Sequence, residues 1–186
     1  MNYTVKSLFL FVLGVVAFAS CSDDNDSTWD EYKDWREENV KFFEEQKFLM
    51  TPQGVNYYQT LTPAWNSSAQ VLIRYFNDRS LTAGNLSPML NSTVDVKYIG
   101  RMYTGEAFDS SYTQTANGDS IFRTQPTGVI PGWQIALMNM HVGDSVEIVI
   151  PYNLAYGSSG SGVIKPYSTL LFNLKLVDIP FYETRP

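Results

Sequence analysis

The chain has 186 residues, of which 13 are Lys or Arg and 19 are Asp or Glu, so its formal net charge is −6. Hydrophobic residues make up 44% and charged residues 17%, a composition typical of a folded domain with a core and not of a disordered chain. The negative charge argues against nucleic acid as a partner. With one cysteine and one histidine, the chain cannot form an internal disulfide or a metal site built from several of these residues.

The first 20 residues are typical of an export signal. An apolar run from Leu8 to Ala19 follows one basic residue, Lys6. This run of 12 residues is too short to span a bilayer and fits the core of a signal peptide. We therefore predict that residues 1–20 are removed on export.

The apolar run ends just before Cys21, the only cysteine of the chain. Small residues directly before a lone cysteine resemble the lipobox of bacterial lipoproteins, although Phe18 stands where that family usually has leucine. The resemblance implies a lipid on Cys21 and an acidic tether, residues 21–27, that holds the protein to the membrane of a bacterial cell envelope. Ser22 after the cysteine resembles a signal for the outer membrane. It does not decide between the periplasmic face and the surface face of that membrane. An ordinary cleaved signal is the alternative.

Residues 22–50 carry 10 acidic and 4 basic residues, and no Pro or Gly occurs from Thr28 to Met50. Aromatic residues recur there near helical spacing, with Asn39 as an interruption. We predict an amphipathic helix over residues 28–50. The favoured interpretation packs its aromatic face on the rest of the chain, and the alternatives are a homodimer through residues 28–50 or an arm that catches substrate.

Residues 51–186 are nearly neutral, with 9 acidic and 8 basic residues, and their apolar pattern is mainly that of β-strands. Short apolar or alternating runs predict strands near residues 56–60, 71–76, 94–98, 146–150 and 170–176. One short helix is predicted at residues 132–140, with Pro131 in its first turn and Gly143 at its exit. The fold class is therefore α+β, an antiparallel β-sheet wrapped around one short α-helix, with an N-terminal helical extension.

Short motifs follow one another along residues 94–178. They are Val96-Lys97-Tyr98-Ile99-Gly100, Gly105-Glu106-Ala107-Phe108-Asp109-Ser110-Ser111, Val129-Ile130-Pro131-Gly132-Trp133, Leu154-Ala155-Tyr156-Gly157 and Thr169-Leu170-Leu171-Phe172. In this order and spacing they resemble the motifs of FKBP-type peptidyl-prolyl cis-trans isomerases. Residues 51–57 are similar to the first strand of the macrophage-infectivity-potentiator branch. The resemblance implies an FKBP-like domain over residues 51–186.

The reaction that the resemblance implies makes and breaks no covalent bond. Rotation of a peptide bond breaks amide resonance, with a barrier of about 18–20 kcal/mol. An enzyme for Xaa-Pro rotation needs no nucleophile, metal or cofactor. It needs a dry pocket for the proline ring, because the twisted amide is less polar than the planar one and is favoured by a desolvated aromatic surface.

The resemblance also implies a role for each residue of the pocket. Trp133 is the floor, Tyr98, Phe108, Ile130 and Phe172 are walls, and Phe122, Val129 and Ile164 complete the substrate-binding surface. The Ile130 backbone N–H and the Tyr156 hydroxyl bind substrate carbonyls, and Asp109 is a polar partner at the rim, bonded to Tyr98.

Two departures from the family pattern stand out. Gln114 occupies the position, five residues after Asp109, where the family commonly has arginine, so Arg123 is considered as a substitute partner for Asp109. Residues 61–91 are longer than usual and suggest an inserted hairpin or flap.

These observations predict a lipid-anchored prolyl isomerase that assists the folding of proline-containing polypeptides outside the cytoplasm. A macrolide inhibitor could occupy the same pocket, as the resemblance implies. The alternatives are a holdase on the same fold that grips peptides without turnover, and an assembly subunit that works through its N-terminal helix.

Overall fold

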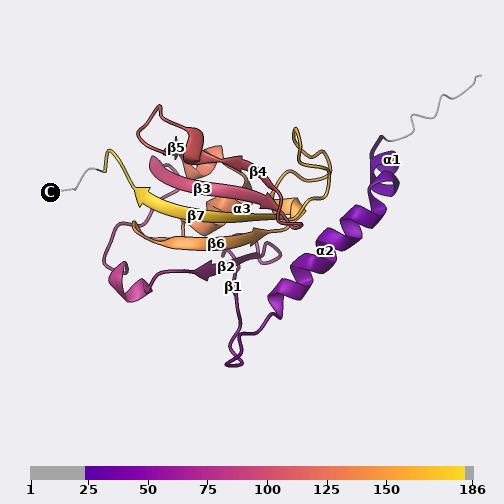
Figure 1. Ribbon diagram of the computed structural model, residues 1–186, viewed down its shortest axis with the longest axis horizontal. Helices are drawn as coiled ribbons and strands as arrows, with labels where there is room; N and C mark the ends of the chain where they lie inside the picture. The colour runs from indigo at the N-terminus through magenta and orange to yellow at the C-terminus, as the bar shows by residue number, and fades with distance from the viewer. Residues whose placement is uncertain (1–23, 183–186) are drawn as a thin grey trace, which may run out of the picture.

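The structure, a computed structural model, describes residues 24–182, with side chains from Thr28 onward (Figure 1). The predictions for residues 1–23, including the signal segment and the lipid on Cys21, lie outside this range. Residues 24–182 form two N-terminal helices, one antiparallel sheet and one short helix packed against it.

Seven strands within residues 24–182 form a single sheet, and every neighbouring pair is antiparallel. The strands are β1 (Gln59–Leu61), β2 (Val71–Tyr75), β3 (Val94–Met102), β4 (Ala107–Ser110), β5 (Phe122–Thr124), β6 (Ser145–Ile150) and β7 (Leu170–Asp178). Their order is β1-β2-β6-β7-β3-β4, and β5 pairs with the first part of β3, whose last part pairs with β4. The predicted fold class is confirmed.

Helix α3 (Pro131–Leu137) packs on one face of this sheet and buries most of its residues there. On the last strand, Leu170, Phe172, Leu174 and Leu176 are buried while the residues between them are more exposed, as the period-two pattern predicts. Pro131 occupies the first turn of α3, where its missing N–H leaves no hydrogen bond unmade.

The predicted insertion extends the sheet. Strands β1 and β2 form a hairpin, with Gln59 opposite Ile73, and β2 pairs along β6. The strand predicted at residues 56–60 begins later, at Gln59, while Asn56 makes only an isolated bridge to Met50. The hairpin therefore closes one edge of the sheet.

The chain that follows the hairpin is fixed to the sheet through Asp144, which is fully buried. Its carboxylate accepts hydrogen bonds from Thr82 Oγ1 at 2.5 Å, Asn77 Nδ2 at 3.0 Å and the His141 N–H at 2.9 Å. Burial alone would raise the pKa of Asp144, but the hydrogen bonds outweigh it and lower that pKa. Residues 77–82 are thus held by hydrogen bonds to a buried carboxylate.

The predicted single helix over residues 28–50 is wrong in its extent and continuity. The structure has α1 (Asp24–Glu31) and α2 (Lys33–Lys47), so residues 24–27, assigned to the tether, are helical. At the break, Tyr32 has a ψ of 21°, and the Trp29 carbonyl accepts a hydrogen bond from the Arg36 guanidinium. In a continuous helix the backbone N–H of Lys33 would bond this carbonyl. Within residues 24–182, none of the helices has the length and apolar character that a membrane-spanning helix requires.

Helix α2 runs past the end of the sheet where β7 begins (Figure 1). Its Phe42 and Phe43 join a hydrophobic cluster with β2 and β6 on the face opposite α3. Phe43 packs with Leu72 and Val149, both fully buried. Asn39, which interrupts the aromatic stripe, is itself fully buried and accepts a hydrogen bond from the Thr169 N–H at 2.7 Å. The favoured interpretation, a helix packed back on its own domain, is confirmed.

Gly132 lets α3 approach the sheet closely, and we expect Gly132→Ala to lower the free energy of unfolding by about 1–3 kcal/mol. A Cβ at this position would lie 2.7 Å from Ile150 Cδ1 and 2.8 Å from Ile150 Cγ1, inside a fully buried contact. Urea unfolding monitored by tryptophan fluorescence measures the change. The matched control is Gly84→Ala, whose Cβ would meet nothing within 4 Å. Equal stability of the two variants would contradict the prediction.

Candidate active site

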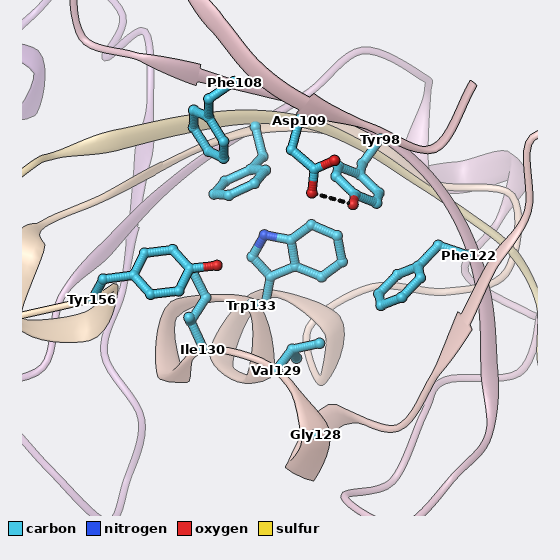
Figure 2. Close-up of a pocket in the computed structure, with 10 residues that line it drawn as sticks. Tyr98, Phe108, Asp109, Phe122, Gly128, Val129, Ile130, Trp133 and Tyr156 are labelled. Atoms are coloured by element: carbon cyan, nitrogen blue, oxygen red, sulfur yellow. Dashed lines mark hydrogen bonds between the residues drawn. The ribbon is translucent and has the colours of Figure 1, made fainter. Parts of the chain in front are cut away.

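A cavity of about 450 Å³ opens between the start of α3 and the strands β3, β4, β5 and β7 (Figure 2). Its volume lies within the range of small-molecule sites. The cavity is lined by Tyr98, Phe108, Asp109, Phe122, Gly128, Val129, Ile130, Trp133, Tyr156 and Phe172. Nine of these ten residues are those that the sequence predicts for the pocket, and they come from segments far apart in the chain.

Trp133 forms the floor of the cavity and is 4% exposed. Its ring lies nearly at right angles to those of Tyr98 and Phe172, with centroids 5.0 and 5.2 Å away. Edge-to-face contacts of this kind stabilise aromatic pairs beyond the area they bury. Within residues 24–182, the buried Trp133 Nε1 has no hydrogen-bond acceptor. The floor is therefore an aromatic surface held in one orientation by its ring contacts, and its indole N–H is an unpaired donor.

The rings of Phe108 and Phe172 pack against each other because β3 has a glycine, Gly100, at the point where they lie over it. A Cβ on Gly100 would lie 2.7 Å from Phe108 Cζ and 2.8 Å from Phe172 Cε1. The two rings instead approach each other at right angles with centroids 5.6 Å apart. Phe122 on β5 closes the other side, with its ring centroid 5.6 Å from that of Tyr98. Any side chain at position 100 would push this wall apart.

Two hydrogen-bond donors face the cavity without a partner in the described part of the chain. Ile130 is the residue directly before α3, and its N–H makes no backbone hydrogen bond there. The Tyr156 hydroxyl likewise has no hydrogen bond, and its side chain points toward Trp133 in Figure 2. Both groups can bind carbonyl oxygens of a peptide seated over Trp133.

Asp109 accepts a hydrogen bond from the Tyr98 hydroxyl at 2.6 Å, as predicted (Figure 2). The Ser110 N–H donates to the other carboxylate oxygen at 2.7 Å. Burial and the bond to Asp109 raise the pKa of Tyr98, while Gln114 acts on it in the opposite direction. Burial and the charge of Asp109 also raise the pKa of Tyr156. Both hydroxyls therefore stay protonated at neutral pH.

Arg123 does not partner Asp109. Its guanidinium binds Asp95 through two hydrogen bonds of 2.7 Å, because Arg123 and Asp95 face each other across the β3–β5 pair. Among residues 24–182, Asp109 has no ion pair. Gln114, at the position of the family's arginine, acts on Tyr98 and lowers its pKa, while burial and Asp109 raise it. The part of the chain that the structure describes holds no group of three or more His, Cys, Asp or Glu arranged for a metal ion.

Ile164 is not among the lining residues. It is 6% exposed and belongs to the hydrophobic core, because a tight turn pairs its backbone with Ser161 and directs its side chain inward. Conversely, Gly128 lines the cavity and was not predicted. It ends the 3-10 turn Pro126–Gly128, directly before Val129. Its position next to the predicted motif is the one sequence feature that could have indicated it as a lining residue. Phe122 lies where it was expected.

Comparison with known proteins places this cavity in a known family. The sequence profile of FKBP-type peptidyl-prolyl cis-trans isomerases matches residues 84–177. The macrophage infectivity potentiator of Trypanosoma cruzi is 32% identical over 184 residues, which cover 96% of this chain and 85% of that protein. The FKBP-type peptidyl-prolyl cis-trans isomerase FkpA of Escherichia coli K12 is 43% identical over 94 residues, 50% of this chain and 33% of FkpA.

Solved structures agree with this relationship. A crystal structure of a peptidyl-prolyl cis-trans isomerase from Pseudomonas syringae superposes with a TM-score of 0.61 and 26% identity, over 79% of this chain and 94% of that chain. The crystal structure of Escherichia coli FkpA gives a TM-score of 0.62 and 29% identity, over 82% of this chain and 64% of that chain. The profile match, the relative aligned over nearly the whole chain and the superposed structures all include the domain that holds the aromatic cavity. The chain belongs to the FKBP-type peptidyl-prolyl cis-trans isomerase family.

Proposed function

We propose that the protein accelerates Xaa-Pro rotation in exported polypeptides by enclosing the proline ring over Trp133. The observation that carries this proposal is the cavity itself, where a buried indole floor is surrounded by aromatic rings and faced by two unpaired donors. Uncatalysed Xaa-Pro exchange takes tens to hundreds of seconds, so a dry pocket of this kind has a slow step to act on.

The proposed mechanism is differential binding of the twisted amide. A planar amide has a polar carbonyl, and twisting the C–N bond removes the resonance that polarises it. The apolar surface of Trp133, Tyr98 and Phe172 therefore favours the twisted form over the planar form. The Ile130 N–H and the Tyr156 hydroxyl would hold neighbouring carbonyls, so that only the prolyl bond rotates.

Asp109 would act at the mouth of the cavity. Its carboxylate holds the Tyr98 hydroxyl at 2.6 Å and so fixes the Tyr98 ring against Trp133. The same carboxylate leaves lone pairs for an N–H group of the substrate. A macrolide inhibitor with a ring in place of the proline would use the same surfaces.

The place of action that we propose is the bacterial cell envelope, with a lipid on Cys21 as the anchor. The support is the apolar segment from Leu8 to Ala19 and the lone cysteine directly after it. Proline-containing polypeptides that fold outside the cytoplasm would be the clients. A homodimer through residues 28–50 stays a prediction, and it would use the exposed face of α2, since the aromatic face is covered by the chain's own domain.

We expect the protein to accelerate cis-to-trans isomerisation of an Xaa-Leu-Pro-Phe peptide, and Tyr156→Phe to lower kcat/KM about three- to tenfold through loss of one hydrogen bond. Asp109→Asn should also lower kcat/KM, because it weakens the bond that fixes Tyr98. The assay is a protease-coupled or NMR exchange measurement on the protein from Ser22 onward. The matched control is Tyr112→Phe, whose side chain is 58% exposed and lies outside the cavity. A folded protein that binds the peptide without accelerating it would instead be a holdase.

We expect kcat/KM to be constant from about pH 6 to about pH 9, because the raised pKa values of Tyr98 and Tyr156 keep both hydroxyls protonated. Stability should fall at higher pH. A tyrosine whose pKa is raised by folding stabilises the protein below the pKa of the unfolded chain, about 10, and this contribution is lost as the pH rises further. A fall in kcat/KM between pH 7 and pH 9 would contradict the assignment of neutral hydroxyls.

We expect Cys21→Ser to release the protein from the membrane fraction of bacteria that express the full chain. Phase partitioning in detergent and metabolic labelling with a fatty acid measure the anchor directly. Retention of the variant in the membrane fraction, or a wild-type chain without label, would show that Cys21 carries no lipid.

A further inference from the structure

The loop from Tyr156 to β7 ends in residues 167–169, and this segment contacts the N-terminal helices. Tyr167 is 4% exposed and has a φ of 60°, a backbone conformation that residues with a side chain seldom adopt. Such a residue persists where its surroundings hold it. Tyr167 is therefore a fixed point in a loop that otherwise contains three glycines with positive φ, Gly157, Gly160 and Gly162.

On its inner side, Tyr167 holds the turn that carries Tyr156. The Tyr167 N–H donates to the Gly157 carbonyl at 2.9 Å. The Tyr167 ring packs edge-on against the Tyr152 ring, with centroids 5.4 Å apart. The Tyr152 carbonyl in turn accepts hydrogen bonds from the N–H groups of Gly157 and Ala155, at 2.9 and 3.0 Å. Both neighbours of Tyr156 are thus bonded to a frame that Tyr167 fixes.

On its outer side, Tyr167 is covered by the junction of α1 and α2. The Trp29 ring meets the Tyr167 ring edge-on, with centroids 5.5 Å apart. The Arg36 guanidinium lies 3.3 Å from the centre of the Trp29 ring and 5.4 Å from that of Tyr167. Arg36 is 7% exposed, and it has no carboxylate partner within residues 24–182. The two rings and the Trp29 carbonyl therefore hold this buried cation.

The two residues after Tyr167 are bonded to the same helix. Trp35 Nε1 donates to Ser168 Oγ at 3.2 Å. The Thr169 N–H donates to Asn39 Oδ1 at 2.7 Å, and Thr169 Oγ1 donates to the Asn39 carbonyl at 3.0 Å. Each residue of the segment 167–169 thus has its own contact with the N-terminal helices.

We propose that Trp29, Arg36 and Tyr167 are positioning residues for Tyr156, so that the N-terminal helices form part of the catalytic apparatus. Tyr156 is 38% exposed and its hydroxyl has no hydrogen bond in the described part of the chain, so its direction is set by the turn beneath it. That turn is held by Tyr167, and Tyr167 is held by Trp29 and Arg36. The inference rests on the proposed isomerase activity.

The test is a double-mutant cycle in the protein from Ser22 onward, with Arg36→Met combined with Tyr156→Phe. Arg36→Met keeps the length of the side chain and removes the planar cation. We expect it to lower kcat/KM about threefold when Tyr156 is present and to cause no further loss in the Tyr156→Phe background, since the hydroxyl that it positions is then absent. Trp29→Ala should behave in the same way, because it removes the ring that covers Tyr167 and stacks on Arg36. Trp29 is 46% exposed and contributes little to the core, so the variant should still fold.

The matched control is Arg74→Met. The Arg74 guanidinium lies 4.1 Å from the centre of the Tyr57 ring, a similar stacked pair outside the lining of the cavity. This variant should leave kcat/KM unchanged. Equal losses from Arg36→Met in both backgrounds would mean that Arg36 acts on the fold as a whole, and this outcome would overturn the inference.

A second measurement does not depend on activity. Hydrogen exchange of the Tyr167 and Gly157 amides should become faster in Arg36→Met and Trp29→Ala and stay unchanged in Arg74→Met. Unchanged exchange in the first two variants would overturn the inference, whatever the activity. An inactive wild type whose amides respond as expected would contradict the proposed function while leaving the contact between the helices and the loop in place.

Discussion

The edge-to-face packing of Trp133 between Tyr98 and Phe172 is the contact on which the rest of the structure depends. It joins α3 to β3 and β7, the two long strands at the centre of the sheet, and it also forms the bottom of the cavity. The same rings therefore serve as core on one side and as binding surface on the other. Two glycines make the contact geometrically possible, since Gly132 brings α3 close to Ile150 and Gly100 leaves room for the rings on β3.

The sheet is buried on both faces at the end formed by β2 and β6. Residues that alternate along these strands point to different partners, with Val71, Ile73 and Ile148 packed toward α3 and Leu72 and Val149 packed toward α2. This arrangement explains why residues 71–73 of β2 and 148–150 of β6 are continuously apolar. The acidic residues of α2 lie on its solvent face, while Arg36, Asn39 and Phe43 are buried against the domain.

The sequence predicted the sheet, α3 and nearly all of the cavity, because local periodicity and the order of the motifs carry that information. Trp133, Tyr98, Phe108, Asp109 and Tyr156 lie in motifs that resemble those of the FKBP-type family, and that resemblance implied that they share one pocket. The errors have a common physical origin. The break at Tyr32, the inward direction of Ile164 and the pairing of Arg123 with Asp95 each depend on contacts between residues distant in the chain or on a turn geometry that single residues do not reveal.

Arg36 and Asn39 illustrate the same limit. In an acidic helix, an arginine is expected to be solvated and an asparagine to lower helix stability. Arg36 and Asn39 are instead buried, and they contact Tyr167 and Thr169 in the loop before β7. Their partners, Tyr167 and Thr169, lie 130 residues or more farther along the chain. No local pattern can indicate such a pairing.

The separation between Asn39 and Thr169 has a consequence for the order in which the chain acquires its structure. A contact that closes 130 residues forms only after most of the chain is available, and its entropic cost is met late in folding. A chain made from its N-terminus therefore presents α2 long before its docking face exists. A boundary drawn at residue 50 would remove Phe42 and Phe43 from the cluster on this face and leave Leu72 and Val149 with less cover.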